Sequence, residues 1–463
     1  MKIYNTLTGS KQEFIPLNGN KVNMYACGIT VSGEAHIGHA DQALIYDIMR
    51  KYLVKKGYDV TYARNYTDVD DKIIAKSNET GIPAEKYAEE MIKVIDREMA
   101  RLQVGDPDIW LKATQNIDEI IDFVEKLIEK GHAYATKKGD VYFSVESFPS
   151  YGKLSHRNLE DAKNGVRIDN DEEKNNPLDF ALWKSAKEGE PYWKSPWGNG
   201  RPGWHIECST MNRKAFGDCI DIHGGGRDLI FPHHENEIAQ TEALTGKPFA
   251  NFWVHNGLIK VNGQKMSKSL GNSLFLKDLL DRYSPETVKF ALLSTNYRAD
   301  INVTDNLFPD AEKHLVEFYG VIISAKQKGI EIAGENEQID KEFDGVMDND
   351  FNTSLAISNL FVYFKKIKLK INAGDLSAGA DINQIIKTYS LLGLFLSSPE
   401  EFVESYGEKK EEIPQEIISL AERIQEARKQ KDYATADSLR AEIDQKGYAI
   451  RITREGYELQ KKN

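Results

Sequence analysis

The chain has 463 residues, three cysteines and a formal net charge of −12, and it is long enough for several hydrophobic cores. Phosphate contacts need Lys and Arg, so the acidic balance argues weakly against a chain coated in nucleic acid and leaves room only for a local basic surface. No apolar run reaches the ~18 residues of a membrane span, and the first residues lack the apolar core of a signal peptide. Three cysteines make no disulfide framework, so we expect a cytoplasmic protein that does not bind membranes.

The first third of the chain predicts an α/β domain. Residues 21–29 form a strand candidate that ends at a glycine-containing loop, and apolar residues recur at helical spacing after Ala40. The alternating segment 59–67 predicts another strand. This order predicts a parallel sheet with a right-handed crossover, in which ligands bind beyond the carboxyl ends of the strands. His36 and His39 lie at such an end.

The pattern changes between residues 112 and 200. Residues 116–131 predict an amphipathic helix that ends at Gly131. Short strand-like pieces follow among turn residues, and the charged segment 167–179 predicts an exposed loop. We expect this region to interrupt the sheet domain, which resumes over 201–255.

The last third of the chain is predicted to be helical. Amphipathic stripes that begin near 306 predict a bundle, the charged segment 399–414 a linker, and 415–463 a small final unit. Basic stretches at 363–372 and 426–431 each fit a solvated helix face. Their gathering in this part of the chain keeps a nucleic-acid surface as a hypothesis.

The turn His36-Ile37-Gly38-His39 has the composition of an anion site. The backbone N–H groups at the start of a helix attract phosphate, two imidazoles can donate to its oxygens, and Gly38 has no Cβ to keep a ligand away. Two histidines that only cap a surface turn fit the same residues equally well.

A second basic element is the loop Lys265-Met266-Ser267-Lys268-Ser269, which has glycines on both sides. Two lysines at this spacing can close over a polyphosphate and neutralise the charge that develops as pyrophosphate leaves. The alternative is a flexible basic loop without a ligand.

Together and in this order, the two motifs resemble the signature motifs of class I aminoacyl-tRNA synthetases. The blocks GWHIECS (203–209) and FPHHENE (231–237) narrow the resemblance to the cysteinyl-tRNA synthetase family, and the similarity extends over almost the full length. The other segments that carry it are CGITV (27–31), NYTDVDDKII (65–74), DIHGGG (221–226), KMSKSLGN (265–272) and DNDFNT (348–353).

The resemblance implies a fold and a domain order. It predicts a Rossmann-type α/β catalytic domain with an inserted α+β connective region, followed by an α-helical bundle and a small C-terminal anticodon-binding domain. The expected boundaries are 1–111 and 201–255 for the two halves of the catalytic domain, 112–200 for the insertion, 256–305 for the KMSKS loop and stem-contact region, 306–398 for the bundle, 399–414 for the linker and 415–463 for the anticodon-binding domain.

The resemblance also implies one zinc ion in the amino-acid pocket. Carried over by motif, its ligands are Cys27, Cys208, His233 and Glu237, a donor set that suits zinc. Without the resemblance, the two cysteines would be interpreted as small core residues. We expect Cys219 to bind no metal, and His234 to point elsewhere on the helix.

The bound metal implies how the amino acid is selected. Zinc binds the substrate thiol as a thiolate, whereas the serine hydroxyl binds less well and alanine offers no ligand. Such a site makes a separate editing domain unnecessary. Four protein ligands fill a tetrahedral shell, so the incoming thiolate either adds a fifth bond or displaces a ligand, and Glu237 is the expected weakest one.

The implied reaction has two steps. Cysteine attacks the α-phosphate of ATP, which Mg²⁺ accompanies, and the terminal adenosine of tRNA(Cys) then attacks the adenylate. The residues expected to steady the phosphates are His36, His39, Lys265 and Lys268, and those expected to bind ATP are His36, Gly38, His39, Asp228 and Lys268. Asp228 is assigned to the ribose, and the amino-acid pocket to Thr67, Trp204 and His223. By the same analogy we expect a monomer.

The sequence departs from the family at three places. Ser32 stands where Tyr is usual, Asp41 stands where Arg is usual, and the chain ends IRITREGYELQKKN rather than with a Gly-Thr-x-Trp-like piece. Three alternatives stay open: a ligase that passes cysteine to a small amine, a synthetase-like paralogue that binds tRNA without catalysis, and a zinc hydrolase. The unit 415–463 argues against the small-amine ligase, and the intact signature residues argue against the non-catalytic paralogue. The absence of H-E-x-x-H argues against the zinc hydrolase.

Overall fold

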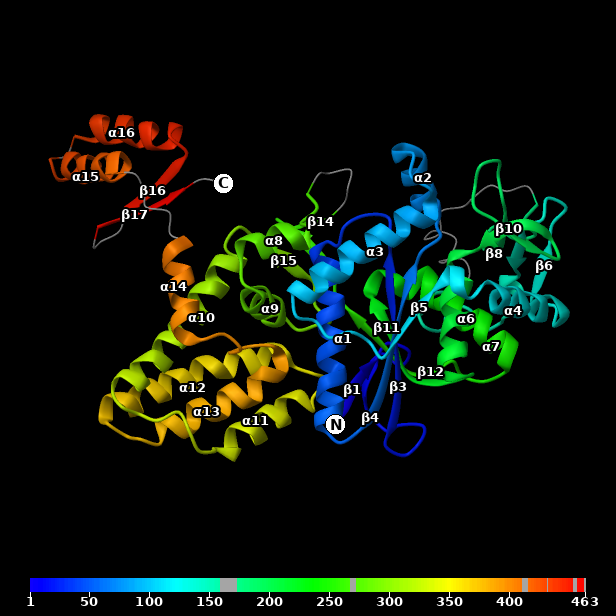
Figure 1. The fold of residues 1–463 in the computed structure, drawn as a ribbon, viewed down its shortest axis with the longest axis horizontal. Helices are drawn as coiled ribbons and strands as arrows, with labels where there is room; N and C mark the ends of the chain where they lie inside the picture. The colour runs from blue at the N-terminus through cyan, green and yellow to red at the C-terminus, as the bar shows by residue number, and fades with distance from the viewer. Residues whose placement is uncertain (159–172, 267–271, 410–414, 431, 453–455, 462–463) are drawn as a thin grey trace. The chain divides into compact units, whose positions relative to one another are not determined.

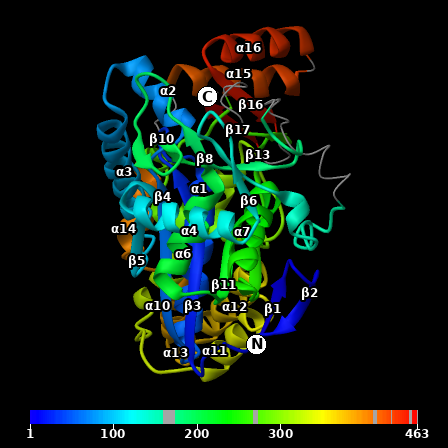
Figure 2. The ribbon, with the colours of Figure 1, turned by 90° about the vertical axis from the view of Figure 1, so that its right-hand side faces the viewer.

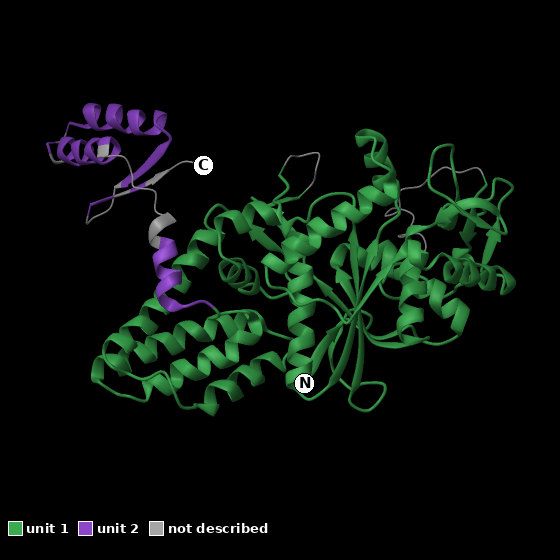
Figure 3. Cartoon of the chain, in the orientation of Figure 1, with its two compact units in different colours: residues 1–396 green, residues 397–463 purple. Residues whose placement is uncertain are grey.

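The computed structural model describes residues 1–158, 173–266, 272–409, 415–430, 432–452 and 456–461. These residues form two compact units, 1–396 and 397–463 (Figure 3). Among the described residues, no helix has both the length and the apolar character needed to cross a bilayer.

A five-stranded parallel sheet forms the centre of the first unit (Figure 1). Its order is β12-β11-β3-β4-β5, so the chain leaves the middle strand first toward one edge and later toward the other. The strands are β3 Lys21–Thr30, β4 Asp59–Thr67, β5 Ile109–Lys112, β11 Ile220–Gly226 and β12 Ala250–Asn256. The predictions of strands at 21–29 and 59–67 are confirmed. The switch in direction lies between β3 and β11, where ligands of such sheets bind.

Helices cover both faces of this sheet (Figures 1 and 2). One face carries α1 Ile37–Lys55 and α3 Ala84–Arg101, and the other carries α6 Trp204–Phe216 and α7 Glu235–Thr245. The short helix α2 Asp71–Thr80 is capped by Asp70 at its start and by Gly81 at its end. The φ of Gly81 is 73°, a left-handed value that favours glycine because glycine has no Cβ. Because both faces are covered, the middle of β3 is an apolar run that is fully buried at Met24, Tyr25 and Ala26.

The region expected to be an insertion is indeed an α+β unit. It contains α4 Ile117–Glu129 and an antiparallel sheet of order β6-β7-β8-β10-β9. The strands are β6 Ala133–Ala135, β7 Val141–Phe143, β8 Phe180–Ser185, β9 Trp193–Ser195 and β10 Gly198–Pro202. Its core continues into α6 and α7 through Ile206 and Ala239. The expected loop 167–179 lies partly outside the described residues.

The chain then returns to the start of α1. A small sheet of order β14-β13-β15 is made by β13 Ile259–Val261, β14 Gln264–Lys265 and β15 Ile301–Val303, with α8 Leu276–Arg282 and α9 Pro285–Leu293 between them in sequence. Ile37 N–H donates to Leu274 O at 2.9 Å, and Leu276 N–H donates to Ala35 O at 2.9 Å. These two hydrogen bonds join residues 274–276, which follow the loop that contains Lys265, to residues 35–37 at the His36 turn.

The predicted bundle consists of α10 Leu307–Gln327, α11 Glu337–Met347, α12 Thr353–Ala373 and α13 Ala378–Tyr389. Before α12, the fully buried Asp350 accepts hydrogen bonds from Tyr4 N, the Tyr297 hydroxyl and Arg298 Nε at 2.7–2.9 Å. Nearby, Lys2 N–H donates to Asp348 O, and Asp350 N–H donates to Lys2 O. The N-terminal hairpin, β1 Lys2–Asn5 with β2 Ser10–Glu13, is thus bound to the bundle.

The second unit has a core of its own. Its elements are α14 Pro399–Lys409, α15 Gln415–Lys429, α16 Tyr433–Gln445, β16 Tyr448–Ile452 and β17 Tyr457–Lys461, and the two strands form an antiparallel hairpin. Ile424, Leu439, Ile443 and Ile450 belong to one buried cluster. The segment 399–414, expected to be a linker, contains the helix α14, and residues 410–414 lie outside the described part.

Candidate active site

A cleft of about 930 Å³ opens at the carboxyl ends of the central strands. The end of β3, the start of α1, the end of β4, the start of α6 and the loop after β11 all contribute to it. Of the predicted site residues, those that line it are Cys27, His36, Gly38, His39, Thr67, Trp204, Cys208, Asp228, His233 and Lys265. His223 and Glu237 are buried behind the residues that line the cleft. Lys268 lies outside the described residues.

The two histidines of the first motif form one wall of the cleft. His36 is the N-cap of α1: its side chain accepts from Gly38 N–H at 3.1 Å, and His39 Nδ1 accepts from His36 N–H at 3.4 Å. The rings stack with their centroids 3.6 Å apart. Because both Nδ1 atoms accept from backbone N–H groups, each neutral ring carries its proton on Nε2. Capping and ligand binding are therefore compatible.

The second basic element approaches the same wall. Lys265 is the last residue of β14 and is exposed, and Met266 lies close to Gly38. The structure thus brings Lys265 and His36 to one cleft, although more than two hundred residues separate them in sequence.

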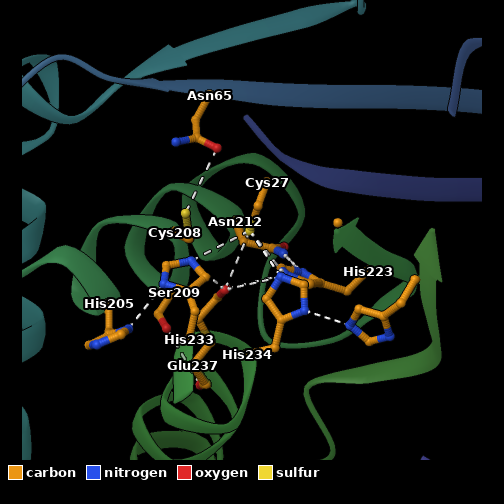
Figure 4. A network of polar contacts seen from close by, with 12 residues as sticks. Cys27, Asn65, His205, Cys208, Ser209, Asn212, His223, His233, His234 and Glu237 are labelled. Atoms are coloured by element: carbon orange, nitrogen blue, oxygen red, sulfur yellow. Dashed lines mark hydrogen bonds and ion pairs between the residues drawn. The ribbon is translucent and has the colours of Figure 1, made fainter. Parts of the chain in front are cut away.

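Four buried side chains converge at the inner end of the cleft, and we call them the thiol cluster (Figure 4). They are Cys27 from β3, Cys208 from α6, His233 from the turn before α7, and Glu237 from α7; their ligand atoms all lie within 4.8 Å of one another. Cys27 Sγ lies 3.7 Å from His233 Nε2 and 3.4 Å from Glu237 Oε1, and these last two atoms are 3.0 Å apart.

The thiol cluster fits a zinc ion. Ligand atoms of a tetrahedral zinc site are separated by about 3.3–3.8 Å, since the bonds are about 2.0–2.3 Å long. The three separations among Cys27, His233 and Glu237 are close to this range, and Cys208 Sγ lies within 4.8 Å of the other ligand atoms. In addition, the Glu237 carboxylate is fully buried, and its Oε2 lies 3.2 Å from His223 Nε2. Two sulfurs, one imidazole nitrogen and one carboxylate oxygen form a donor set that zinc accepts.

The electrostatics of the thiol cluster favour the anionic forms of two of its side chains, Cys208 and Glu237. Burial raises the pKa of Cys27, but a hydrogen bond from Cys27 lowers the pKa of Cys208 to about 6. Burial opposes ionisation of Glu237, yet His223 and His233 lower the pKa of its carboxyl well below the usual value. Burial also disfavours charge on His233, but Glu237 and Cys208 raise its pKa to about 10. Cys208 and Glu237 thus favour the anionic forms in which they would bind a cation, and metal binding would displace the proton of His233.

The prediction that His234 points elsewhere is wrong. Its Nε2 lies 3.3 Å from Cys27 Sγ, and its Nδ1 lies 2.8 Å from His255 Nε2. The prediction assumed a regular helix from 231 onward. Instead Ile230–His234 forms a π-helical turn with extended Phe231, so neighbouring imidazoles both face the sulfur.

The amino-acid pocket residues occupy different depths. Thr67 ends β4 and is buried, whereas Trp204 is 38% exposed and stacks on His233 with a centroid distance of 4.4 Å. His223 is fully buried, and its Nδ1 lies 2.9 Å from Asn212 Nδ2. Its Nε2 faces Glu237 at 3.2 Å. His223 therefore lies beside the thiol cluster rather than on the cleft surface.

Sequence reasoning missed two side chains that touch this site. Gln42 lies one helical turn after His39 and lines the cleft, and Asn65 lies on β4 beside Cys208. Asn65 stood within a motif of the resemblance, but no local pattern distinguished Gln42 from an ordinary helix residue.

The chain is similar to known proteins over most of its length. Residues 13–313 match the family described as tRNA synthetases class I (C) catalytic domain, and residues 342–396 match the DALR domain. The chain is 45% identical over 479 residues to the cysteine–tRNA ligase of Maridesulfovibrio salexigens, with 98% of this chain and 99% of the relative covered. It is 46% identical over 477 residues to that of Geobacter metallireducens, with 97% of each covered.

The fold is similar to that of the methionyl-tRNA synthetase of Mycobacterium tuberculosis solved with methionyl-adenylate. The TM-score is 0.59 at 13% identity, and the match covers 83% of this chain and 93% of that chain. A LeuRS–tRNA–LeuAMS ternary complex from Agrobacterium radiobacter gives a TM-score of 0.55 at 13% identity, with 84% and 88% covered. At this identity the likeness concerns the fold alone.

Proposed function

Because this chain belongs to the cysteine–tRNA ligase family, we propose that its cleft activates L-cysteine with ATP and that a zinc ion in the thiol cluster selects the substrate. The chain is a ligase that forms an aminoacyl-tRNA with cysteine. The observation that carries the zinc proposal is the convergence of two cysteines, a histidine and a glutamate from three separate segments at one buried point.

In the first step the cysteine carboxylate attacks the α-phosphate of ATP, cysteinyl-adenylate forms, and pyrophosphate leaves with its Mg²⁺. The Nε2–H groups of His36 and His39 donate to phosphate oxygens as charge develops on them. Lys265, at the rim, neutralises the leaving pyrophosphate, and we assign the same role to Lys268, outside the described residues.

The chain's own residues hold the reactants in line. Gly38 lets the nucleotide approach the start of α1, and Asp228, which follows β11, binds the ribose hydroxyls. Thr67 and Trp204 enclose the amino acid, and His223 supports Glu237 from behind. Positioning and electrostatics carry the reaction, and no covalent enzyme nucleophile is needed.

When bound, the zinc ion supplies a soft Lewis acid that holds the substrate sulfur as a thiolate. Cys27, Cys208, His233 and Glu237 would hold it, and Glu237 would be the weakest of these four ligands. Serine lacks the sulfur. A site built around one specific polar bond can discriminate against an analogue that cannot make this bond by a factor of roughly 10⁴–10⁵.

In the second step a hydroxyl of the terminal adenosine of tRNA(Cys) attacks the adenylate carbonyl and AMP leaves. We assign the catalytic halves to 1–111 and 201–255, the connective region to 112–200 and the stem contact to 256–305. The bundle 306–398 follows the acceptor arm, the segment 399–414 connects it to the final unit, and 415–463 reads the anticodon. We expect the protein to act as a monomer.

Cysteine-dependent ATP–pyrophosphate exchange, followed by charging of purified tRNA with labelled cysteine, tests this function. Both activities are expected. Exchange without charging would favour transfer to a small amine, and no exchange would favour a tRNA-binding paralogue. The relatives compared are tRNA ligases over their full length, which supports neither alternative.

The zinc proposal is tested by the metal content of Cys208→Ser with Cys219→Ser as its matched control, since Cys219 lies outside the thiol cluster. Cys208→Ser is expected to lose bound zinc, because the serine hydroxyl is less acidic than the cysteine thiol and its oxygen is a harder donor than sulfur. Equal zinc in both variants would contradict the proposed ligand set.

A further inference from the structure

The strand that carries Cys27 is irregular at that residue. The pairing of β3 with β4 shifts register between Ala26 and Ile29, so that Cys27 and Gly28 together lie opposite Asn65. A bulge of this kind leaves a peptide group outside the ladder and redirects the side chain beside it. Here the redirected side chain is a member of the thiol cluster.

The peptide between Cys27 and Gly28 is held from both sides by side-chain amides. Gln42 Nε2 donates to Cys27 O at 2.6 Å, and Gly28 N–H donates to Asn65 Oδ1 at 2.8 Å. The same Asn65 oxygen lies 3.8 Å from Cys208 Sγ. Both hydrogen-bonding groups of the bulged peptide are therefore satisfied by α1 and β4 side chains in place of the sheet ladder.

The surroundings leave little freedom for this peptide. Gln42 and Asn65 are 8% and 1% exposed, and a buried peptide group that loses its partner carries the full cost of its desolvation. A Cβ on Gly28 would come 1.6 Å from the Asn65 carbonyl oxygen, so the backbones of the two strands touch here. The direction of the Cys27 thiol depends on these contacts.

We propose that Gln42 and Asn65 are positioning residues that clamp the Cys27–Gly28 peptide and thereby set the geometry of the thiol cluster. Gln42 stands on the helix that His36 caps, so the clamp also fixes the distance between the nucleotide end of the cleft and the sulfur end. The inference rests on the zinc site proposed above.

The test follows zinc release from the full-length, zinc-loaded protein to the chromogenic chelator 4-(2-pyridylazo)resorcinol. Gln42→Met removes the donor at nearly constant length, and Asn65→Leu removes the acceptor. Both are expected to release zinc about 10–100-fold faster, the usual range when a group that orients a metal ligand is lost. Both should also raise KM for cysteine more than KM for ATP in the exchange reaction. Gln42→Lys, which restores a donor, should return both values toward the wild type.

Gln384→Met is the matched control, since Gln384 is 9% exposed and its Nε2 donates to Thr388 within the bundle. It is expected to release zinc at the wild-type rate. Wild-type release rates in both Gln42→Met and Asn65→Leu would overturn the clamp, as would equally fast release in the control. A wild-type protein that holds no zinc would instead overturn the zinc proposal, a result that the loading step alone reveals.

Discussion

Asp41 follows the first motif on α1, where a charged residue has to be accommodated inside the protein. It is 2% exposed, its Oδ2 lies 3.4 Å from Asn256 Nδ2, and its Oδ1 has no hydrogen bond. Burial raises the pKa of this carboxyl from 3.8 to about 7, although the Asn256 amide lowers it somewhat. The start of α1 thus carries a group that is largely neutral in the folded protein below pH 7.

This environment predicts a pH-dependent stability. Between about pH 4 and 7 the folded state binds the proton that the unfolded state has released, so stability falls as pH rises through this window. Each pKa unit corresponds to about 1.4 kcal/mol. Asp41→Asn should therefore raise the melting temperature at pH 8 by clearly more than at pH 5, as measured by thermal denaturation. The exposed control Asp59→Asn should show neither effect, and an equal gain at both pH values would contradict the argument.

At the scale of single residues, the sequence predicted which residues belong to the site better than it predicted where their side chains point. Cys27 and Cys208 could be assigned only through the resemblance, because they come from distant segments whose meeting depends on the fold. His234 was misplaced because a π-helical turn rotates it onto the sulfur. Gln42 was missed because its partner is a backbone carbonyl on another element, which no local pattern records.

At the scale of elements, α1 combines structural and chemical roles at its first turn. His36 satisfies Gly38 N–H and stacks on His39, while its ring also lines the cleft. A serine at this position keeps an acceptor for the helix N-terminus, because Ser is among the preferred N-caps.

His36→Ser should therefore separate the two roles. We expect a loss of stability of at most about 1 kcal/mol but a fall in kcat for ATP–pyrophosphate exchange of roughly 10²–10³, the usual cost of removing one donor to developing charge. Urea denaturation and exchange kinetics on the same preparation measure both. A fall in activity only as large as the lost folded fraction would show that the residue is a cap alone.

The elements themselves were largely predictable. Alternation and apolar runs located β3 and β4, and helical periodicity located α4 and the bundle, since each depends on neighbours in sequence. The start of α1 was placed late because its cap is a histidine rather than a usual N-cap residue. The bulge at Cys27 was not predictable, because side chains from two other elements replace its ladder bonds.

For the whole molecule, the division into two units places the described part of the proposed active site in the first of them. Every described member of the proposed site lies within residues 1–396, and residues 397–463 include a separate buried core. The helical character of the chain after 306 could be predicted from its amphipathic stripes, but periodicity did not show that the charged segment after 398 contains a helix.

A protein truncated after Leu396 should keep cysteine-dependent ATP–pyrophosphate exchange and lose charging of tRNA. We expect kcat/KM for tRNA to fall roughly 100-fold or more, because phosphate and base contacts supply most of the affinity for a nucleic acid. Exchange and aminoacylation assays on the truncated and full-length proteins measure the two effects. Undiminished charging would remove 397–463 from the tRNA-binding surface.

The hydrogen bonds between Lys2 and residues 348 and 350 also order events during synthesis. The first strand leaves the ribosome early, but its partners in the bundle follow almost 350 residues later. At roughly 5–20 residues per second, this interval is on the order of 20–70 s. Throughout it, the N-terminal hairpin lacks the hydrogen bond from Tyr4 N–H to Asp350, so slow translation lengthens the time during which contacts such as those with β12 have to hold it.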